Sequence, residues 1–263
     1  MSEQNPLKNS LSKYFDEIDP VLFFNEYLVR LIKVLKSSNH ITYDEKHGQH
    51  LSYLQFEANP EHKEFINFLL NSLHSFNNTT ENDNQKLMEY ANSITGWITH
   101  RKKDIPSRVV EIIENKEILY QNYLARAKYL TNEYPEKIYS PILLIPEIFL
   151  IFCDVLESNE IDDDYKLEVS LALVYLVSPI DLLPENFINH PLSLLDDLFL
   201  MLGAYNIEEI NKISNLRDSY DNSVFERIDG AISEIKKEFG EDSVITIHES
   251  VAAVKENIKL GKK

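Results

Sequence analysis

The chain has 263 residues and a formal net charge of −17 at pH 7, with 43% hydrophobic and 11% aromatic residues. This length allows one large domain or two, and the hydrophobic content is that of a globular protein. The negative charge argues against non-specific binding of DNA or RNA, because neutralising phosphates requires clustered Lys and Arg. The six glycines lie too far apart for a phosphate-binding loop, a dinucleotide fingerprint or a G-x-S-x-G nucleophile elbow.

The single cysteine, Cys153, excludes an internal disulfide and a cysteine-rich zinc site. It lies in the apolar run Ile148–Leu156, so we expect it to be a buried small hydrophobic residue. The first ten residues lack the apolar core of a signal peptide. No apolar run reaches the ~20 residues that a membrane-spanning helix needs. We therefore expect a cytoplasmic protein without a transmembrane segment.

The first hundred residues predict a polar leader followed by amphipathic helices. Asp19-Pro20 is typical of a helix start, with an N-cap followed by Pro at the first helical position. Apolar residues at spacings of three and four predict helices over Val21–Lys36, Glu61–Phe76 and Gln85–His100. Between them, Asn77–Asn84 is a polar loop, and His50–Phe56 is a possible short strand.

The remainder also reads as helices. The predicted segments are a long helix from Ile105 to about Tyr129, one through Phe149–Leu156, then Leu171–Val177, Leu192–Tyr205, Ile207–Leu216, Ser223–Phe239 and Ser243–Leu260. A short strand at Val244–Ile247 is the alternative within the last segment. The prediction is an all-α protein, a compact multi-helix bundle around a central helical hairpin. We divide it into an N-terminal helical region (1–104), a helical domain with the hairpin (105–218) and C-terminal helices (219–263).

The central hairpin, Leu171–Tyr205, is the most apolar stretch of the chain and carries acids inside its apolar runs. It contains Ser178-Pro179-Ile180-Asp181-Leu182-Leu183-Pro184 and, about a dozen residues later, Leu195-Asp196-Asp197. This pattern resembles the core of the bacterial YkvA-like family, a short helical domain of unknown function. The resemblance covers roughly Asp164 to Tyr205. It departs from the family at Glu185, where Asp is usual, and at Asn189-His190-Pro191, which replaces an approach containing Gly.

Four acids of this hairpin form the best candidate site: Asp181, Glu185, Asp196 and Asp197. Two helices meeting at a tight turn can bring them together, and Mg²⁺ or Mn²⁺ relieves the repulsion between neighbouring carboxylates. Such a site could activate water for phosphoester hydrolysis. The competing and favoured interpretation is structural, with the acids accepting hydrogen bonds from the turn, because only His190 in the motif could act as acid or base.

The histidines His40, His47, His50, His62 and His74 are a looser set. The His47–His50 spacing could serve zinc, although we favour surface histidines. No metalloprotease H-E-x-x-H motif occurs, and Asp162-Asp163-Asp164 lacks the spacing of a calcium loop.

Aromatic residues are more numerous than we expect a core alone to need, and exposed aromatics anchor interfaces. The set is Tyr14, Phe15, Phe23, Phe24, Tyr27, Tyr129, Tyr134 and Tyr139; a wide helical core is the favoured alternative. With no catalytic motif found, we expect a non-enzymatic protein–protein interaction module, for an unidentified protein partner. One alternative is a metal-dependent hydrolase using Asp181, Asp196 and Asp197. A second is a peripheral membrane protein that uses the hairpin as a wedge.

Overall fold

The computed structural model describes residues 6–18, 23, 27, 30, 105–135, 137–177, 191–244, 247–252 and 256. Every regular element in these ranges is a helix, which confirms the all-α class. The helices predicted over Glu61–Phe76 and Gln85–His100 and the strand at His50–Phe56 lie outside the described residues.

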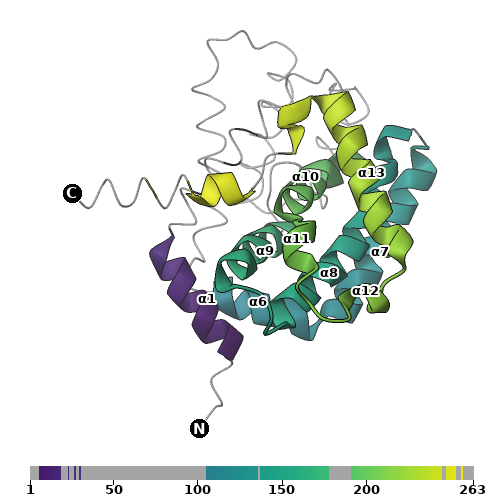
Figure 1. The fold of residues 1–263 in the computed structure, drawn as a ribbon. Helices are drawn as coiled ribbons and strands as arrows, with labels where there is room; N and C mark the ends of the chain where they lie inside the picture. Colours follow the sequence, from purple (N-terminus) through teal and green to yellow (C-terminus); the bar gives the residue numbers. More distant parts are fainter. Residues whose placement is uncertain are drawn as a thin grey trace, which may run out of the picture.

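Two apolar helices form the centre of the fold (Figure 1). Helix α9 (Asp163–Leu176) and helix α10 (Leu195–Ala204) pack against each other, and α8 (Ile145–Glu157) contacts both. Every residue of α10 is buried. A helix that is apolar all round is stable only inside a core, so the composition of the predicted hairpin explains its central position.

Helix α1 (Pro6–Glu17) corrects the prediction of a polar leader. Its residues Leu11 and Phe15, with Ile18 just beyond its end, are buried. These residues are spaced by four and three, so they share one helical face. That face packs on α6 (Ile105–Glu114) and on α9. The leader is therefore a helix of the core.

The long helix predicted from Ile105 is interrupted at Asn115. The chain forms α6 and then α7 (Lys116–Glu133). The Asn115 side-chain amide donates a hydrogen bond to the Glu111 carbonyl at 2.8 Å. The Asn115 backbone N–H still donates to the same carbonyl, at 3.1 Å, so the side chain adds a hydrogen bond without removing the helical one. The apolar periodicity continues across Asn115 and does not predict this turn.

A 3₁₀ helix, η3 (Lys137–Leu144), runs directly into α8. Residues Tyr139–Glu157 form one helical segment of 19 residues, which is long and apolar enough to cross a bilayer. However, 67% of the 18-residue apolar stretch within this segment is buried inside the protein. A buried core helix passes the same test. The expected absence of a transmembrane segment is thus not confirmed.

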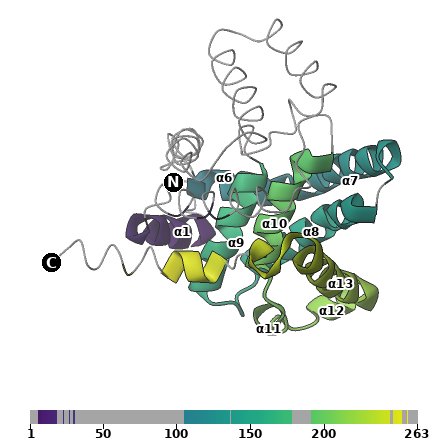
Figure 2. The same cartoon turned by 90° about the horizontal axis from the view of Figure 1, so that it is seen from above.

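The short 3₁₀ helix η4 (Pro191–Leu194) leads directly into α10. Helices α11 (Ile207–Ile210), α12 (Leu216–Ser219) and α13 (Asn222–Phe239) lie together on one side of the centre (Figure 2), and η5 (Glu241–Ser243) follows α13. The single helix predicted over Ile207–Leu216 is wrong, because a turn with Asn215 at φ 65° separates α11 from α12. The predicted stop at Gly240 is confirmed.

Residues 247–252 are helical, which confirms part of the last predicted helix. Ile247 belongs to that helix and Val244 lies in a bend, so these two residues do not form the alternative strand.

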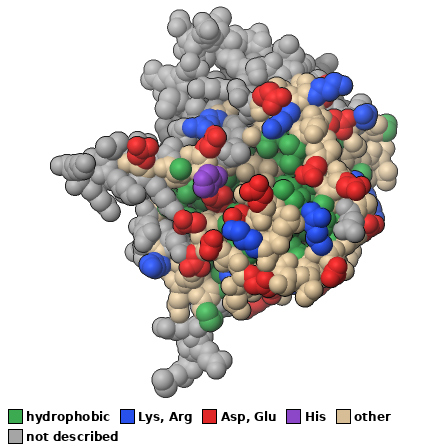
Figure 3. All heavy atoms as spheres, viewed as in Figure 1, with side chains coloured by type: hydrophobic (Ala, Val, Ile, Leu, Met, Phe, Trp, Pro, Cys, Tyr) green, Lys and Arg blue, Asp and Glu red, His purple; other side chains and the backbone are tan. Residues whose placement is uncertain are grey.

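Most of the described aromatics belong to the core. Phe15, Phe23 and Tyr27 are buried, whereas Tyr129 on α7 is 47% exposed. The favoured account, a wide helical core, therefore holds for the first three. On the face shown in Figure 3, acidic side chains are spread among the other groups and do not gather in one patch.

Candidate functional site

Asp196 and Asp197 lie side by side in the first turn of α10, only 0% and 1% exposed. The first turn of a helix favours negative charge, because backbone N–H groups there lack intrahelical partners. Burial of two adjacent carboxylates is costly without such compensation. The position at the helix start therefore accounts in part for how the core accommodates them.

Two buried tyrosines lie beside this pair. The Tyr175 hydroxyl, from α9, donates a hydrogen bond to Asp196 Oδ2 at 2.8 Å. The pKa of Tyr27 is raised well above its usual value, first by burial and then by the negative charges of Asp196 and Asp197. Both effects keep Tyr27 a neutral phenol. Asp196 thus joins α9 to α10 inside the core. The donor lies on α9 and not in the turn that the favoured interpretation named, and that turn lies outside the described residues, so the interpretation stays a prediction.

The other two acids of the predicted metal site, Asp181 and Glu185, lie outside the described residues, as does His190. In the part of the chain that the structure describes, no three His, Cys, Asp or Glu side chains gather as a metal site would require. The metal site therefore stays a prediction. The five histidines of the looser set (His40, His47, His50, His62 and His74) also lie outside the described residues.

Cys153 is buried in α8, as predicted. Burial raises the pKa of its thiol to about 12, with a smaller opposing effect from Lys116. A thiol in this state is neither a nucleophile nor a metal ligand near neutral pH.

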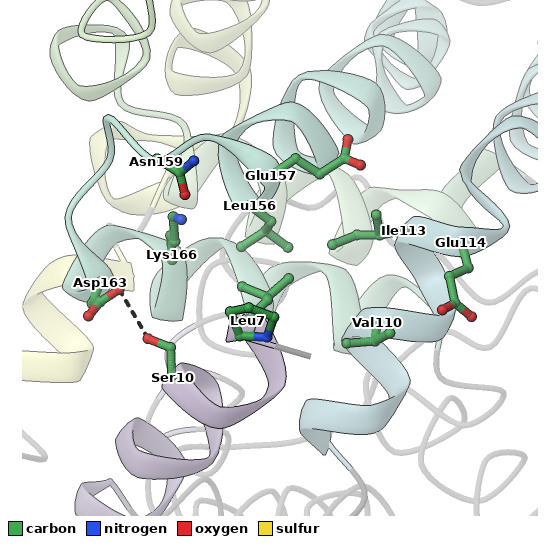
Figure 4. Close-up of a pocket in the computed structure, with 11 residues that line it drawn as sticks. Leu7, Ser10, Val110, Ile113, Glu114, Leu156, Glu157, Asn159, Asp163 and Lys166 are labelled. Atoms are coloured by element: carbon green, nitrogen blue, oxygen red, sulfur yellow. Dashed lines mark hydrogen bonds between the residues drawn. The ribbon is translucent and has the colours of Figure 1, made fainter. Parts of the chain in front are cut away.

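A groove of about 470 Å³ opens between α1, α6 and the α8–α9 connection (Figure 4). Its apolar lining is Pro6, Leu7, Val110, Ile113 and Leu156. Its polar lining is Ser10, Glu114, Glu157, Asn159, Asp163 and Lys166. The volume is in the range of pockets that hold a small ligand or an anchoring side chain.

The carboxylates of the groove outnumber its cations. Glu114, Glu157 and Asp163 contribute three carboxylates, and Lys166 the one ammonium of the lining. Glu157 is paired with Lys116 at the edge of the groove. The Ser10 hydroxyl donates to Asp163 Oδ1 at 3.1 Å and joins α1 to the start of α9. Leu156 is buried and the other apolar side chains of the groove, except Pro6, are half-buried, whereas its three acids are exposed. The groove is therefore apolar in its floor and acidic at its rim.

Lys166 differs from the ion-paired lysines. Its pKa is lowered, chiefly by burial and against a smaller raising effect of Asp163. The pKa values of Lys137 and Lys212 are raised by hydrogen-bonded carboxylates. Within the described residues, the Lys166 ammonium makes no hydrogen bond and no close ion pair. It is therefore partly desolvated, and the charge of Asp163 compensates for this only in part.

A second hollow, of about 380 Å³, lies where α6, α7 and the end of α9 meet. Ile118, 64% exposed, and Val177 are among its lining residues. It is smaller than the groove, and nothing in the described residues indicates an occupant.

Sequence reasoning missed the groove because its lining comes from four separate segments. The apolar spacing Leu7, Leu11, Phe15 would have identified α1 as an amphipathic helix. The run Asp162-Asp163-Asp164 lacks the spacing of a calcium loop and indicates no site by itself. No local pattern indicates that α1 and α6 lie beside that point.

The comparison with known families places the hairpin in a domain of unknown function. The family described as "Protein of unknown function (DUF1232)" matches residues 166–203, which include α10 and most of α9. The match confirms that the hairpin is a domain of unknown function. The YkvA-like assignment and the proposed core motif remain predictions.

A curated archaeal protein is similar over a longer stretch. The "Uncharacterized protein ORF9" of Methanothermobacter thermautotrophicus is 31% identical over 100 residues, which cover 36% of this chain and 67% of the relative. The chain belongs to the family of this archaeal protein. No solved structure matches the chain. Neither the DUF1232 domain nor the relative carries an assigned activity.

Proposed function

We propose that the protein is a non-enzymatic interaction module that binds a cationic, apolar-anchored segment of a partner protein in the groove beside the DUF1232 domain. The observation that carries the proposal is the composition of that groove, an apolar floor with one ammonium and three carboxylates at its rim, of which Glu157 is paired with Lys116. A partner side chain of Leu or Phe type would fill the floor, and Lys or Arg side chains would meet the rim.

Apolar burial supplies most of the affinity in such an arrangement. Fully burying one Leu or Phe side chain is worth about 1.5–3 kcal/mol. Each exposed ion pair at the rim adds about 0.2–1 kcal/mol. The protein's charge of −17 also attracts a cationic partner at long range and raises the association rate at low salt. We therefore expect a modest, salt-sensitive affinity.

Fluorescence anisotropy with three labelled peptides tests the proposal. The first peptide combines Lys and Leu, the second replaces every Lys by Glu, and the third replaces every Leu by Ser. Only the first should bind the full-length protein well, because the others lack either charge complementarity or the apolar anchor. Its binding should weaken as salt is added.

Charge reversals at two positions test whether the first peptide binds in the groove. Glu114 lines the groove, whereas Glu226 is exposed on α13, on the side of the molecule away from α1 (Figure 1). Glu114→Lys should weaken binding of the first peptide about three- to tenfold, which is about 0.7–1.4 kcal/mol. Glu226→Lys makes the same change in net charge and should leave binding nearly unchanged. Equal losses in the two variants would mean that the groove is not the site.

Membrane association is a second candidate, and the apolar segment Tyr139–Glu157 favours it. Because 67% of the apolar stretch in this segment is buried, the segment could reach lipid only if the helices packed around it moved apart. Flotation with neutral and anionic liposomes tests this candidate. Protein that stays in the aqueous fraction with both vesicle types would exclude it.

A further inference from the structure

We propose that Lys166 is a site of acylation within the groove and that the acyl group regulates which partners the groove accepts. The regulatory part rests on the proposed function, whereas the chemical reactivity of Lys166 does not. No motif of the sequence indicates this residue. Its role follows from its position in the fold.

The geometry sets Lys166 apart from the other described lysines. Lys116, Lys137, Lys212 and Lys236 all form ion pairs. Lys8, Lys13, Lys128 and Lys237 are exposed. Lys166 is half-buried and lines a groove of about 470 Å³, open enough to admit a small electrophile. In Figure 4 its amino group lies on the side of Asn159, between the α8–α9 connection and α1.

Partial burial in the groove favours the neutral amine, which is the nucleophilic form. Lys166 lies close to the start of α9, where the helix dipole disfavours a positive charge. Burial also lowers its pKa, and Asp163 only partly opposes this effect. At a given pH, a larger share of Lys166 than of an exposed lysine is therefore unprotonated.

The reaction requires an acyl phosphate as co-reactant. The neutral Lys166 amine attacks the carbonyl carbon of the acyl phosphate. A new C–N bond forms, the bond from that carbon to the phosphate oxygen breaks, and phosphate leaves with the electron pair. The nitrogen loses a proton to water, so the product is a neutral amide. No electrons are gained or lost, and no redox partner is needed.

Acylation would change the charge of the groove. Before the reaction the groove has three carboxylates, of which Glu157 is paired with Lys116, and the one ammonium of Lys166. After the reaction the charge of Lys166 is lost. A cationic segment is repelled by Lys166 in the unmodified groove and is no longer repelled in the acylated one. Modification would therefore strengthen binding of the partner class proposed above.

Mass-spectrometric mapping of the full-length protein treated with acetyl phosphate at about pH 8 tests the reactivity. Lys128, exposed on α7 and without an ion pair in the described structure, is the reference. Lys166 should acetylate at least about threefold faster than Lys128 in the folded protein. In guanidinium chloride the two rates should become similar, because the effect comes from the fold. A folded-state rate equal to or below that of Lys128 would overturn the proposal.

Asp163→Asn sharpens this test. It removes the carboxylate that raises the pKa of Lys166, so acetylation of Lys166 should become faster while that of Lys128 stays the same. Slower acetylation of Lys166 in this variant would contradict the electrostatic account.

A binding measurement separates this inference from the proposed function. Lys166→Gln, which imitates the neutral amide, should bind the Lys–Leu peptide about two- to threefold more tightly than the unmodified protein. If the peptide binds neither form, the proposed function fails, and the acetylation rates still decide the chemistry of Lys166. If the peptide binds both forms equally, the regulatory part is wrong.

Discussion

Asp196 is a carboxylate kept in the core by a specific donor from a neighbouring helix. It is 0% exposed, and the Tyr175 hydroxyl lies 2.8 Å from its Oδ2. A hydrogen bond to a buried charge contributes more than a neutral one, because loss of the donor leaves the charge less solvated. This bond links the two helices of the DUF1232 domain and so has a measurable effect on stability.

Tyr175→Phe should lower the free energy of unfolding by about 1.5–3 kcal/mol, the range for a hydrogen bond to a charged group. Tyr123→Phe is the matched control, because the Tyr123 hydroxyl donates to a neutral acceptor, the Leu176 carbonyl, at 3.1 Å. That change should cost about 0.5–1.5 kcal/mol. Urea unfolding of both variants gives the two values. Similar losses would mean that the charge of Asp196 does not strengthen the bond.

Thermal melts with divalent cations test the metal site predicted at Asp181, Glu185, Asp196 and Asp197. A divalent cation at a hundred times its dissociation constant would add ~2.7 kcal/mol, roughly 5–10 °C in Tm for a chain of this size. Because Asp196 is already engaged by Tyr175, we expect no shift with Mg²⁺ or Mn²⁺. We expect a large, metal-independent loss of stability in the Asp196→Asn/Asp197→Asn double variant. A wild-type shift that disappears in this variant would instead support the predicted metal site.

Helix α13 has a glycine in its interior and a second glycine at its end, and we expect these two glycines to have opposite effects on stability. Gly230 lies inside the helix, and Gly240 ends it with φ 94° and ψ 161°. An added Cβ would meet no atom within 4 Å at either position. Substitution at these sites therefore changes backbone conformational energy and not packing.

Gly230→Ala should stabilise the protein by about 0.5–1 kcal/mol, because Ala restricts the unfolded chain and favours the helix. Gly240→Ala should destabilise it by about 1–3 kcal/mol, because non-glycine residues rarely adopt that backbone conformation. Thermal melts of the two variants provide the comparison. Two changes of the same sign would contradict the assignment of the helix end at Gly240.

Across the whole molecule, several tyrosines are held as neutral phenols. Burial is the largest cause of the raised pKa of Tyr27, Tyr165, Tyr205 and Tyr220. For Tyr220 the next cause is its hydrogen bond to Asp154 Oδ2, at 2.6 Å. These residues come from separate segments, so their ionisation reports on the fold as a whole.

Stability should therefore fall as the pH rises above about 10, the ordinary pKa of tyrosine. Above that pH the unfolded chain loses phenol protons that the folded protein keeps, so alkali favours unfolding. Below it, the contribution of these groups is fully present. Urea unfolding across this range, with phenolate absorbance recorded in parallel, tests the expectation. Ionisation of all tyrosines in a protein that stays folded would contradict it.

The sequence by itself determined the features that depend on local pattern. The apolar runs of α9 and α10 predicted two buried helices, and Gly240 predicted the end of α13. The apolar neighbours of Cys153 predicted its burial. In each case the information lies within a few turns of helix, because periodicity and backbone preference act over short sequence distances.

Tertiary structure alone decided which of these segments meet. It placed Tyr27 beside Asp196, although they are far apart in sequence, and it brought α1 against α6 and α9 to form the groove around Lys166. The break at Asn115 likewise escaped an apolar periodicity that continues across it. A local pattern shows which face of a helix is apolar but not which partner covers it, because helix packing depends on the shapes of side chains distant in the chain.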